Sequence, residues 1–498
     1  MATRIQVRRD NAADWNSINP TLAEGEIGFE TDTGKFKIGN GSSLWSALDY
    51  FGESLYQPID NEIYTRQYFQ ANKLVSLDLE NTDYFGYSVA ISGNNNTMII
   101  GAAGDDQDVE SFNGAAYIYE FSNSGWNQQT KLLASDIQGF AAFGCSVDIS
   151  QDGNTVAVGA FGSNSASVDP EFTGNGAVYI FTRSGSTWTQ QAKLLASDLD
   201  SSDSFGSSVS LSTDGNMVVV GAPNEDTSPN SFNGAAYVFT RSGSIWTQES
   251  KFIASDPGDY FNFGRSVSLS SDKSTAAVGC PGASATYVFT RSGTSWTEQE
   301  KLVASDGEGS EGFGYEVSIS SNGNIVLVGA YTEDTLANTD NGAAYVFARS
   351  ESTWTQQAKL LASDAEGNDN FGISVNISND GNTAIIGSRA DQMGTNKIGK
   401  AYIFDYVNAA WSQTDILTAL DGVDTDKFGN AVVISEDKST IIVGARFEDT
   451  GDETDQGAVY VFNSSKLSSV DSYLISVIET LSGQIEDLTS RVEALESP

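Results

Sequence analysis

The sequence contains no histidine and only two cysteines among its 498 residues. Without histidine there can be no Ser-His-Asp triad, no Cys-His dyad and no zinc site with histidine ligands. Cys145 and Cys280 are too few for a disulfide framework, and they occupy different positions of the repeat described below. We therefore expect both to be small buried residues that do not pair with each other.

Basic residues are also scarce, with 26 Lys and Arg against 66 Asp and Glu, which gives a formal net charge of −40. A phosphate backbone would repel this charge, so nucleic-acid binding is excluded. No run of 18 apolar residues exists, and the first ten residues lack the apolar core of a signal peptide. We expect a soluble protein without membrane insertion, not exported by the usual secretory pathway.

A repeat with a mean period of about 57 residues runs through most of the chain. The dipeptide Phe-Gly begins at Phe85, Phe143, Phe205, Phe263, Phe313, Phe371 and Phe428. A second glycine follows the first by 15 residues in every copy, at Gly101, Gly159, Gly221, Gly279, Gly329, Gly387 and Gly444. A tyrosine follows at Tyr117, Tyr179, Tyr237, Tyr287, Tyr345, Tyr402 and Tyr460. A tryptophan lies nine residues after the first six tyrosines, at Trp126, Trp188, Trp246, Trp296, Trp354 and Trp411.

Each repeat has the pattern of four short strands. In the second repeat we expect strands at 146–149, 155–158, 177–181 and 188–195, with turns at 151–154 and 183–186. Asp-Gly and Asn-Gly between β-rich runs favour tight hairpins, because these residues tolerate positive φ. Seven units of four antiparallel strands predict a mainly β protein, a seven-bladed β-propeller spanning residues 67–463.

The ends of the repeat array predict how the ring closes. The seventh repeat has three strands and ends near Phe462, so its fourth strand is missing. Lys73 lies 12 residues before Phe85, as Lys131 lies 12 before Phe143, and Tyr68 fills the position of a repeat tryptophan. We therefore expect residues 67–78 to supply the outer strand of blade seven, which would remove the exposed sheet edges of an open array.

The two ends of the chain differ from the repeats. Residues 1–52 carry turn signals at Asp32–Gly34 and Gly39–Gly41 between short apolar strands, which predicts a small β-rich module, and residues 53–66 form a connector. In residues 467–496 apolar side chains recur with heptad spacing, at Leu474, Ile478, Leu481, Ile485, Leu488, Val492 and Leu495. This pattern is typical of a short coiled coil that makes the protein an oligomer, and the alternative is a single amphipathic helix packed on the propeller.

The heptad pattern does not decide how many helices form the coiled coil. β-branched residues at a and Leu at d favour a dimer, whereas Ile475 and Val477 widen the apolar face and favour a trimer.

The repeats resemble the FG-GAP family, the repeat of the integrin α-chain head. Phe205-Gly206 followed by Gly221-Ala222-Pro223 gives the full motif of that family in one blade. The resemblance implies a seven-bladed ring whose loops bind a protein or glycan partner. Integrin-type blades that hold calcium carry an Asp-x-Asp-x-Asp-Gly loop between their first two strands. The 15-residue spacing leaves room only for tight turns here, so we expect Asp152, Asp214 and Asp380 to be turn residues rather than calcium ligands.

Residues 4–51 resemble the small N-terminal domain of bacteriophage tail fibre and tropism-determinant proteins. The resemblance rests on the segments 22–29 and 32–41 and on Trp45. It implies a β-rich, usually trimeric module that docks a fibre onto phage tail or baseplate proteins. A homotrimer is therefore the expected assembly.

Acidic pairs occupy the loops between the second and third strands of four blades. They are Asp105 and Asp106, Glu225 and Asp226, Glu333 and Asp334, and Glu448 and Asp449. The connections between blades are acidic too, and both loop sets emerge on one face of an up-and-down propeller, opposite turns that carry Arg183, Arg241, Arg291 and Arg349.

Three interpretations of the acidic face remain open. It is a solvated surface, a set of carboxylates that bridges through Ca²⁺ to an acidic host glycan or protein, or a glycosidase site. The third is disfavoured, because an active site should place a unique pair of acids in one cleft, whereas these acids recur from blade to blade. We assign no catalytic residue, and no metal or cofactor site beyond this candidate face.

The tryptophans are candidates for sugar stacking, but their identical spacing favours packing between blades. Aromatic residues in the variable loops are the better candidates, namely Phe112, Phe172, Phe232 and Tyr331. Blade four lacks the long loop, since Tyr287 follows Gly279 by only eight positions.

These features together predict a virion structural protein, made in the host cytoplasm and incorporated into the virion as a tail fibre. Its propeller heads would bind a host surface glycan or protein by multivalent adhesion, without enzymatic activity. The alternatives are a structural appendage without a receptor, such as a neck or capsid-decorating fibre, and a polysaccharide depolymerase.

Overall fold

The computed structural model divides the chain into two units, Met1–Tyr64 and Thr65–Pro498. The structure describes residues 7–10, 20–21, 27–30, 36–38, 42, 44, 46, 66–76, 78, 80–106, 112–122, 125–136, 140–162, 175–198, 200, 202–226, 231–306, 312–334, 340–389, 398–423, 426–449 and 454–466. The heptad positions from Leu474 to Leu495 lie outside these residues, so the coiled coil stays a prediction. Within the described ranges, no helix has the length and apolar character needed to cross a membrane.

The first unit contains a three-stranded sheet of β1 (Val7–Asp10), β2 (Ile27–Glu30) and β3 (Phe36–Ile38). β1 pairs in parallel with β2, with Val7 opposite Ile27, and β2 pairs antiparallel with β3, with Ile27 opposite Ile38. These strands lie within the β-rich module expected for residues 1–52.

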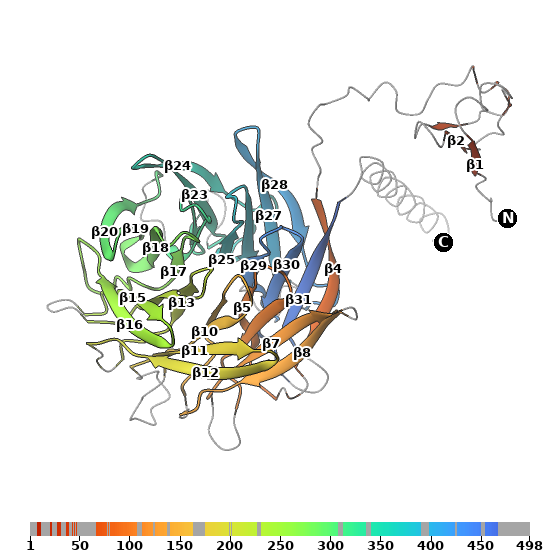
Figure 1. Ribbon diagram of the computed structural model, residues 1–498. Coiled ribbons are helices and arrows are strands. Elements are labelled where there is room, and N and C mark those ends of the chain that lie inside the picture. The colour runs from red at the N-terminus through yellow and green to blue at the C-terminus, as the bar shows by residue number, and fades with distance from the viewer. Residues whose placement is uncertain are drawn as a thin grey trace, which may run out of the picture. The chain divides into compact units, whose positions relative to one another are not determined.

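The second unit is a ring of seven four-stranded sheets, which confirms the predicted propeller (Figure 1). Blade 1 contains β5 (Phe85–Ile91), β6 (Thr97–Ala102), β7 (Ala115–Ser122) and β8 (Gly125–Leu132). Blade 2 contains β9 (Ser146–Ile149), β10 (Thr155–Ala160), β11 (Ala177–Ser184) and β12 (Thr187–Leu194). Blade 3 contains β13 (Ser208–Leu211), β14 (Met217–Ala222), β15 (Ala235–Ser242) and β16 (Ile245–Phe252).

Blade 4 contains β17 (Val267–Leu269), β18 (Thr275–Cys280), β19 (Ala285–Ser292) and β20 (Ser295–Leu302), with the 3-10 turn η2 (Pro281–Ala283) in place of the long loop. Blade 5 contains β21 (Phe313–Ile319), β22 (Ile325–Ala330), β23 (Ala343–Ser350) and β24 (Thr353–Leu360). Blade 6 contains β25 (Phe371–Ile377), β26 (Thr383–Ser388), β27 (Lys400–Val407) and β28 (Ala410–Leu417). Blade 7 contains β29 (Phe428–Ile434), β30 (Thr440–Ala445), β31 (Ala458–Lys466) and β4 (Arg66–Leu74).

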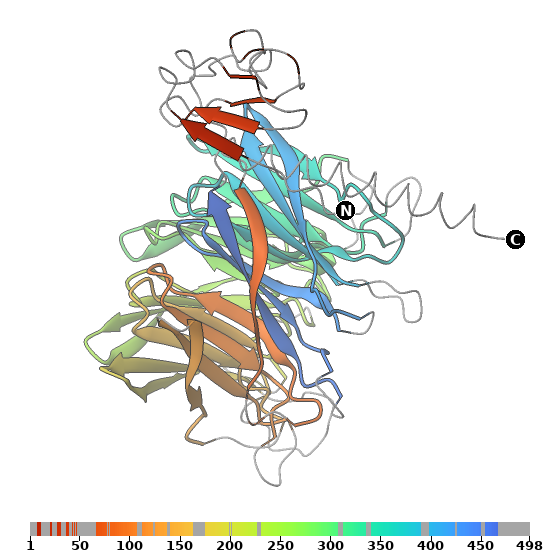
Figure 2. The ribbon, with the colours of Figure 1, turned by 90° about the vertical axis from the view of Figure 1, so that its right-hand side faces the viewer.

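The ring closes through β4, as the sequence predicted. β4 pairs antiparallel with β31, with Ser464 opposite Tyr68 and Tyr460 opposite Lys73, and the two strands lie side by side although they are far apart in the chain (Figure 2). Tyr68 is buried and donates its hydroxyl to the carbonyl of Lys438 at 2.8 Å. The outer strand of blade 7 therefore comes from the N-terminal side of the array.

In blade 2, burial is greatest in the second and third strands, whereas β9 beside the channel is buried only at alternate positions. β10 is buried at all six positions, β11 at its first five, and β12 only at Leu194. The phenylalanine of each Phe-Gly pair packs edge-on against two aromatic rings of the third strand, and Phe143 lies 5.5 Å from Tyr179 and 6.1 Å from Phe181 between ring centroids. These core clusters join neighbouring blades, since Phe143 belongs to one cluster with Ile118 of blade 1.

The glycine spacing of the repeat is explained by the seams between blades. A Cβ atom at Gly159 of blade 2 would lie 2.0 Å from the carbonyl oxygen of Gly206, the Phe-Gly glycine of blade 3. Gly206 has a φ of +92°, which only glycine adopts readily. The same contact recurs around the ring and closes it, because Gly444 of blade 7 meets the carbonyl oxygen of Gly86 in blade 1.

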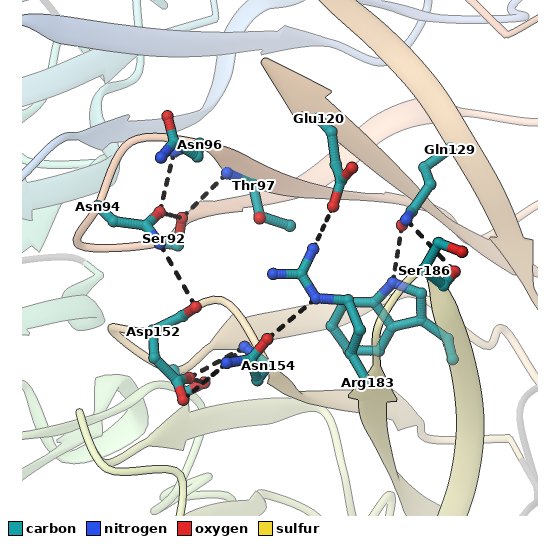
Figure 3. A network of polar contacts seen from close by, with 12 residues as sticks. Ser92, Asn94, Asn96, Thr97, Glu120, Gln129, Asp152, Asn154, Arg183 and Ser186 are labelled. Carbon is teal, nitrogen blue, oxygen red and sulfur yellow. Dashed lines mark hydrogen bonds and ion pairs between the residues drawn. The ribbon is translucent and has the colours of Figure 1, made fainter. Parts of the chain in front are cut away.

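The first hairpin of each blade ends in a tight turn held by an acid or amide side chain (Figure 3). Asp152 accepts the hydroxyl of Ser150 at 2.6 Å and the backbone N–H of Asn154 at 3.0 Å. Asp214 and Asp380 make the same pair of contacts in blades 3 and 6. These three aspartates are turn residues, as predicted.

Candidate functional site

The two acidic loop sets do meet on one face of the propeller. Connections into the blades are hydrogen-bonded to loops between second and third strands, as in Gly104 N–H to Asp83 C=O at 3.1 Å and Ala142 N–H to Phe112 C=O at 3.0 Å. Where the structure describes these loops, the two sets interlock through such hydrogen bonds on the face predicted to be acidic.

The first acid of each predicted pair points inward and meets a lysine of the outer strand. Asp105, Glu225 and Glu448 are buried, and Glu333 is largely buried. Their partners are Lys131 at 2.8 Å for Asp105, Lys251 for Glu225, Lys359 at 2.9 Å for Glu333 and Lys73 at 2.5 Å for Glu448. Burial raises the pKa of Asp105, although its hydrogen bonds from Lys131 and Tyr117 oppose the rise.

The second acid of each pair holds its own loop. Its carboxylate accepts the backbone N–H of the residue six positions later, at distances of 2.6–2.8 Å. The pairs are Asp106 with Phe112, Asp226 with Phe232, Asp334 with Asp340, and Asp449 with Asp455. These second acids are exposed, and one oxygen of each has a structural role in the loop.

Each outer-strand lysine also bridges two blades. Lys251 of blade 3 lies 2.7 Å from Asp198, which follows the outer strand of blade 2, and 5.3 Å above the ring of Tyr237. Burial alone would raise the pKa of Asp198, but the hydrogen bond and the charge of Lys251, together with further hydrogen bonds, lower it. In blade 6, Ile416 fills the lysine position and Lys400 contacts Asp364 instead. The recurrence of this contact gives the acids between blades a structural role that sequence reasoning missed.

A further group of buried carboxylates lies just before the Phe-Gly pairs. Burial raises the pKa of Asp83 to about 7, against the backbone hydrogen bond from Glu80 N–H. Burial also raises the pKa of Asp426 to about 7, and Glu448 nearby adds to the rise. Across the ranges that the structure describes, no three His, Cys, Asp or Glu side chains are grouped as metal ligands. Cation bridging at the acidic pairs stays a prediction.

The repeat tryptophans contact the neighbouring blade. Trp188 donates its indole N–H to Gln129 of blade 1 at 2.9 Å, and the guanidinium of Arg183 lies 5.4 Å above its ring. Figure 3 shows Arg183 between Asn154, which belongs to the turn of its own blade, and Glu120 of blade 1. Trp246, Trp296, Trp354 and Trp411 repeat the indole contact. These side chains stabilise the seams, as their spacing indicated.

The aromatic residues of the variable loops pack against one another. Phe112 stacks with Phe140 at 6.1 Å and Phe232 stacks with Tyr260 at 5.5 Å between ring centroids. Tyr331 lies 4.4 Å from Tyr315 at the channel described next. Phe172 lies outside the described residues.

The first strands surround a central channel with a cavity of about 770 Å³. Its middle is lined by small polar side chains that accept a backbone N–H from the next blade. These contacts are Leu211 to Asp148, Leu269 to Ser210, Ile319 to Ser268, Ile377 to Ser318, and Ile434 to Asn376. Burial raises the pKa of Asp148 to about 6, although hydrogen bonds from Leu211 and Ile149 oppose the rise. These hydrogen bonds link the first strands of blades 2 to 7 along the channel wall.

One mouth of the channel gathers basic and aromatic side chains from several blades. The guanidinium of Arg265 lies 4.3 Å from the ring centroid of Tyr315, and that of Arg446 lies 5.0 Å from Tyr87. Arg389 also lines the channel. Glu316 accepts the hydroxyl of Ser266 at 3.1 Å. Burial raises the pKa of Glu316 to about 7 even though Arg265 opposes the rise.

Sequence reasoning did not find this mouth, but the aligned repeats contain its signal. The residue after each Phe-Gly is Tyr87, Cys145, Ser207, Arg265, Tyr315, Ile373 or Asn430. The residue two positions after each second glycine is Ala103, Phe161, Pro223, Pro281, Tyr331, Arg389 or Arg446. These two positions vary from blade to blade beside invariant glycines, as expected where side chains face a ligand rather than a seam.

Two family models match the chain. The model for the FG-GAP repeat matches residues 68–119, 126–181, 188–239, 246–294, 296–347, 354–404 and 411–462. The model for the major tropism determinant N-terminal domain matches residues 5–43.

Two curated proteins resemble a short part of the chain. A hyaluronoglucosaminidase of Streptococcus pyogenes phage H4489A is 49% identical over 47 residues, which are 9% of this chain and 13% of that protein. A hyaluronoglucosaminidase of Streptococcus pyogenes phage H10403 is 41% identical over 59 residues, 12% of this chain and 18% of that protein. The chain thus spans less than a fifth of the length of these relatives.

Proposed function

Because the chain belongs to the FG-GAP repeat family and also carries a match to the major tropism determinant N-terminal domain, we propose that it is a phage tail fibre that binds a host receptor. The N-terminal module would dock to tail or baseplate proteins, and the propeller would contact the host surface. The observation that carries the proposal is the presence of both parts in one chain. The similarity to two phage proteins supports a place in the virion.

The distribution of side chains in the propeller supports a binding head. The seams are built from the same glycines, lysines and aromatic residues in nearly every blade, whereas the mouth of the channel differs from blade to blade. A rigid scaffold that presents variable positions in a concave site is typical of recognition proteins.

Several heads on one fibre would strengthen weak contacts. When a second head binds from the same fibre, its effective concentration is set by the linkage, and avidity exceeds the single-site affinity by roughly 10²–10⁴-fold. A homotrimer held by the N-terminal module or by the heptads of residues 467–496 would supply this linkage.

A polysaccharide depolymerase is the second candidate, favoured by the similarity to the two phage hyaluronoglucosaminidases. Most glycosidases need a pair of carboxyl groups that flank the scissile bond. The channel lining contributes the carboxylates Glu316 and Asp148, and Asp148 already accepts two backbone N–H groups. This arrangement favours binding over hydrolysis.

The test is binding of the purified, fluorescently labelled full-length chain to intact bacteria, including Streptococcus pyogenes, with and without a chelator. Saturable binding that unlabelled protein displaces is the expected result, and loss of binding with chelator would assign a role to bound cations. Absence of saturable binding to every strain of the panel would favour a structural appendage. Release of reducing sugar from host polysaccharide would identify a depolymerase instead.

A further inference from the structure

Among the described residues that line the channel, the arginines lie on one side of the mouth. Arg265, Arg389 and Arg446 come from blades 4, 6 and 7, whereas blades 2 and 3 contribute uncharged residues such as Phe161, Pro223 and Asn224. Three guanidinium groups therefore line one arc of a cavity in a protein whose net charge is −40.

Few of the described side chains that line the channel beside Arg265 and Arg446 are carboxylates. Of the two carboxylates in the described lining, Glu316 lies closer in sequence to its Phe-Gly pair, whereas Asp148 lies further along the first strand and is held by backbone N–H groups. Nε of Arg446 is buried and has no hydrogen-bond partner among the residues that the structure describes. By contrast, the outer-strand lysines that bridge neighbouring blades have carboxylate partners within 3.0 Å. Among the described residues, no salt bridge joins Arg446 to an acid, and its buried Nε keeps a donor that an external anion could accept.

Aromatic rings and amides lie beside the arginines. Tyr87 and Tyr315 line the cavity under Arg446 and Arg265, and Tyr331 packs behind Tyr315 and lies 6.0 Å from the guanidinium of Arg389. Asn224, Asn262 and Asn430 add amide groups to the lining. Flat rings, amides and hydroxyls recognise a saccharide ring and its hydroxyl groups, and guanidinium groups recognise a carboxylate or phosphate.

We propose that the central channel binds an acidic saccharide, with the carboxylate or phosphate of the sugar at Arg265, Arg389 and Arg446 and the sugar ring against Tyr87 and Tyr315. The inference rests on the proposed function, because it names the receptor class of the adhesin. The cavity volume of about 770 Å³ is in the range of ligand sites, roughly 300–1,000 Å³. The raised pKa of Glu316 leaves this carboxyl partly protonated near neutral pH, so it opposes an incoming anion less than a full charge would.

The experiment is calorimetric titration of the full-length chain with three oligosaccharides of equal length, one of uronic acids, one substituted with phosphate and one neutral. We expect an acidic oligosaccharide to bind at least tenfold more tightly than the neutral one, and the comparison of the two acidic ligands identifies the anionic group. Arg446→Gln should weaken this binding tenfold or more. Arg241→Gln is the matched control, because Arg241 also lies over an aromatic ring, Trp246 at 5.3 Å, but outside the channel lining.

Three results would overturn the inference: no binding of either acidic ligand at millimolar concentration, equal binding of the neutral ligand, or unchanged affinity in Arg446→Gln. The melting temperature of each variant shows whether the ring is intact. Binding to cells is measured in parallel. If the natural chain binds cells and Arg446→Gln binds them equally well, the adhesin stands and this site is wrong. If the natural chain binds no cells, the proposed function fails whatever the titration gives.

Discussion

Replacing Gly159 with alanine tests the physical reason for the spacing of the repeat. The new Cβ would lie 2.0 Å from the carbonyl oxygen of Gly206 and 2.2 Å from Oγ of Ser146, whereas ordinary contacts begin at 3.4 Å. The seam between blades 2 and 3 would have to open by about 1 Å, because the contacting atom belongs to the backbone and cannot rotate away.

Two contributions lower the free energy of unfolding of Gly159→Ala. Overpacking a tight site costs about 1–3 kcal/mol. The hydrogen bond from the Ser146 hydroxyl to the Gly206 carbonyl, 2.8 Å long, would be strained or lost, at about 1 kcal/mol. The sum is about 2–4 kcal/mol, which lowers the melting temperature of a propeller of roughly 400 residues by about 2–5 °C.

Urea unfolding followed by tryptophan fluorescence, together with calorimetry, measures this loss. Gly93→Ala is the matched control, because the nearest atoms there belong to the exposed side chains of Gln151 and Glu436, which can move. Gly444→Ala should cost as much as Gly159→Ala, since it meets the carbonyl oxygen of Gly86 across the closing seam at 2.2 Å. Equal stability of Gly159→Ala and Gly93→Ala would refute the account of the seams.

Three further predictions concern pH, the seam lysines and assembly. In the folded protein the pKa values of Asp83 and Asp426 are about 7, above the unfolded value of 3.8. Between these two pH values the folded state binds more protons than the unfolded state, so the free energy of unfolding rises as the pH falls. From pH 8 to 5.5 the gain is roughly 2 kcal/mol per group, and Asp83→Asn should flatten the profile measured by urea unfolding. Lys251→Met should lower the free energy of unfolding by about 2–3 kcal/mol, because it leaves Glu225 and Asp198 without their cation. Lys273→Met removes a more exposed ion pair with Asp214 and should lower it by less than about 1 kcal/mol. Similar losses in the two variants would contradict the bridging role of Lys251. Leu481→Asp with Leu488→Asp should leave the propeller folded and reduce the mass in solution from oligomer to monomer, and an unchanged mass would assign assembly to the N-terminal module alone.

The ring was predictable because its determinants are periodic. Each blade repeats the same Phe-Gly, the same second glycine and the same tyrosine, so seven weak strand signals reinforce one another. The closing strand was predictable for the same reason, since Lys73 and Tyr68 occupy repeat positions relative to Phe85. The role of Asp152 as a turn residue was also predictable, because the 15-residue spacing between the two glycines leaves room only for a tight hairpin.

The candidate site was harder to predict, because it consists of the residues that break the period. Arg265, Tyr315 and Arg446 come from three different blades and meet only after the ring closes. The acidic pairs were candidate site residues because they recur in several blades. In the structure they hold the scaffold together, since Glu225 forms an ion pair with Lys251 and Asp226 accepts a hydrogen bond from its own loop. In a repeat protein, repeated residues build the scaffold and irregular residues at concave positions build the site.

The most direct test of the account is a disulfide that traps β4 on β31, because closure of the ring positions every blade around the channel. Phe69 and Asn463 lie opposite each other on these strands and are exposed, and residues so placed are about 4.5–5.5 Å apart between Cα atoms, within the range of a disulfide. Phe69→Cys with Asn463→Cys should form one bond within a single chain, identified by peptide mass, whereas Phe69→Cys with Ser350→Cys should not. Failure of residues 69 and 463 to link, or a link only between two chains, would contradict the closed ring.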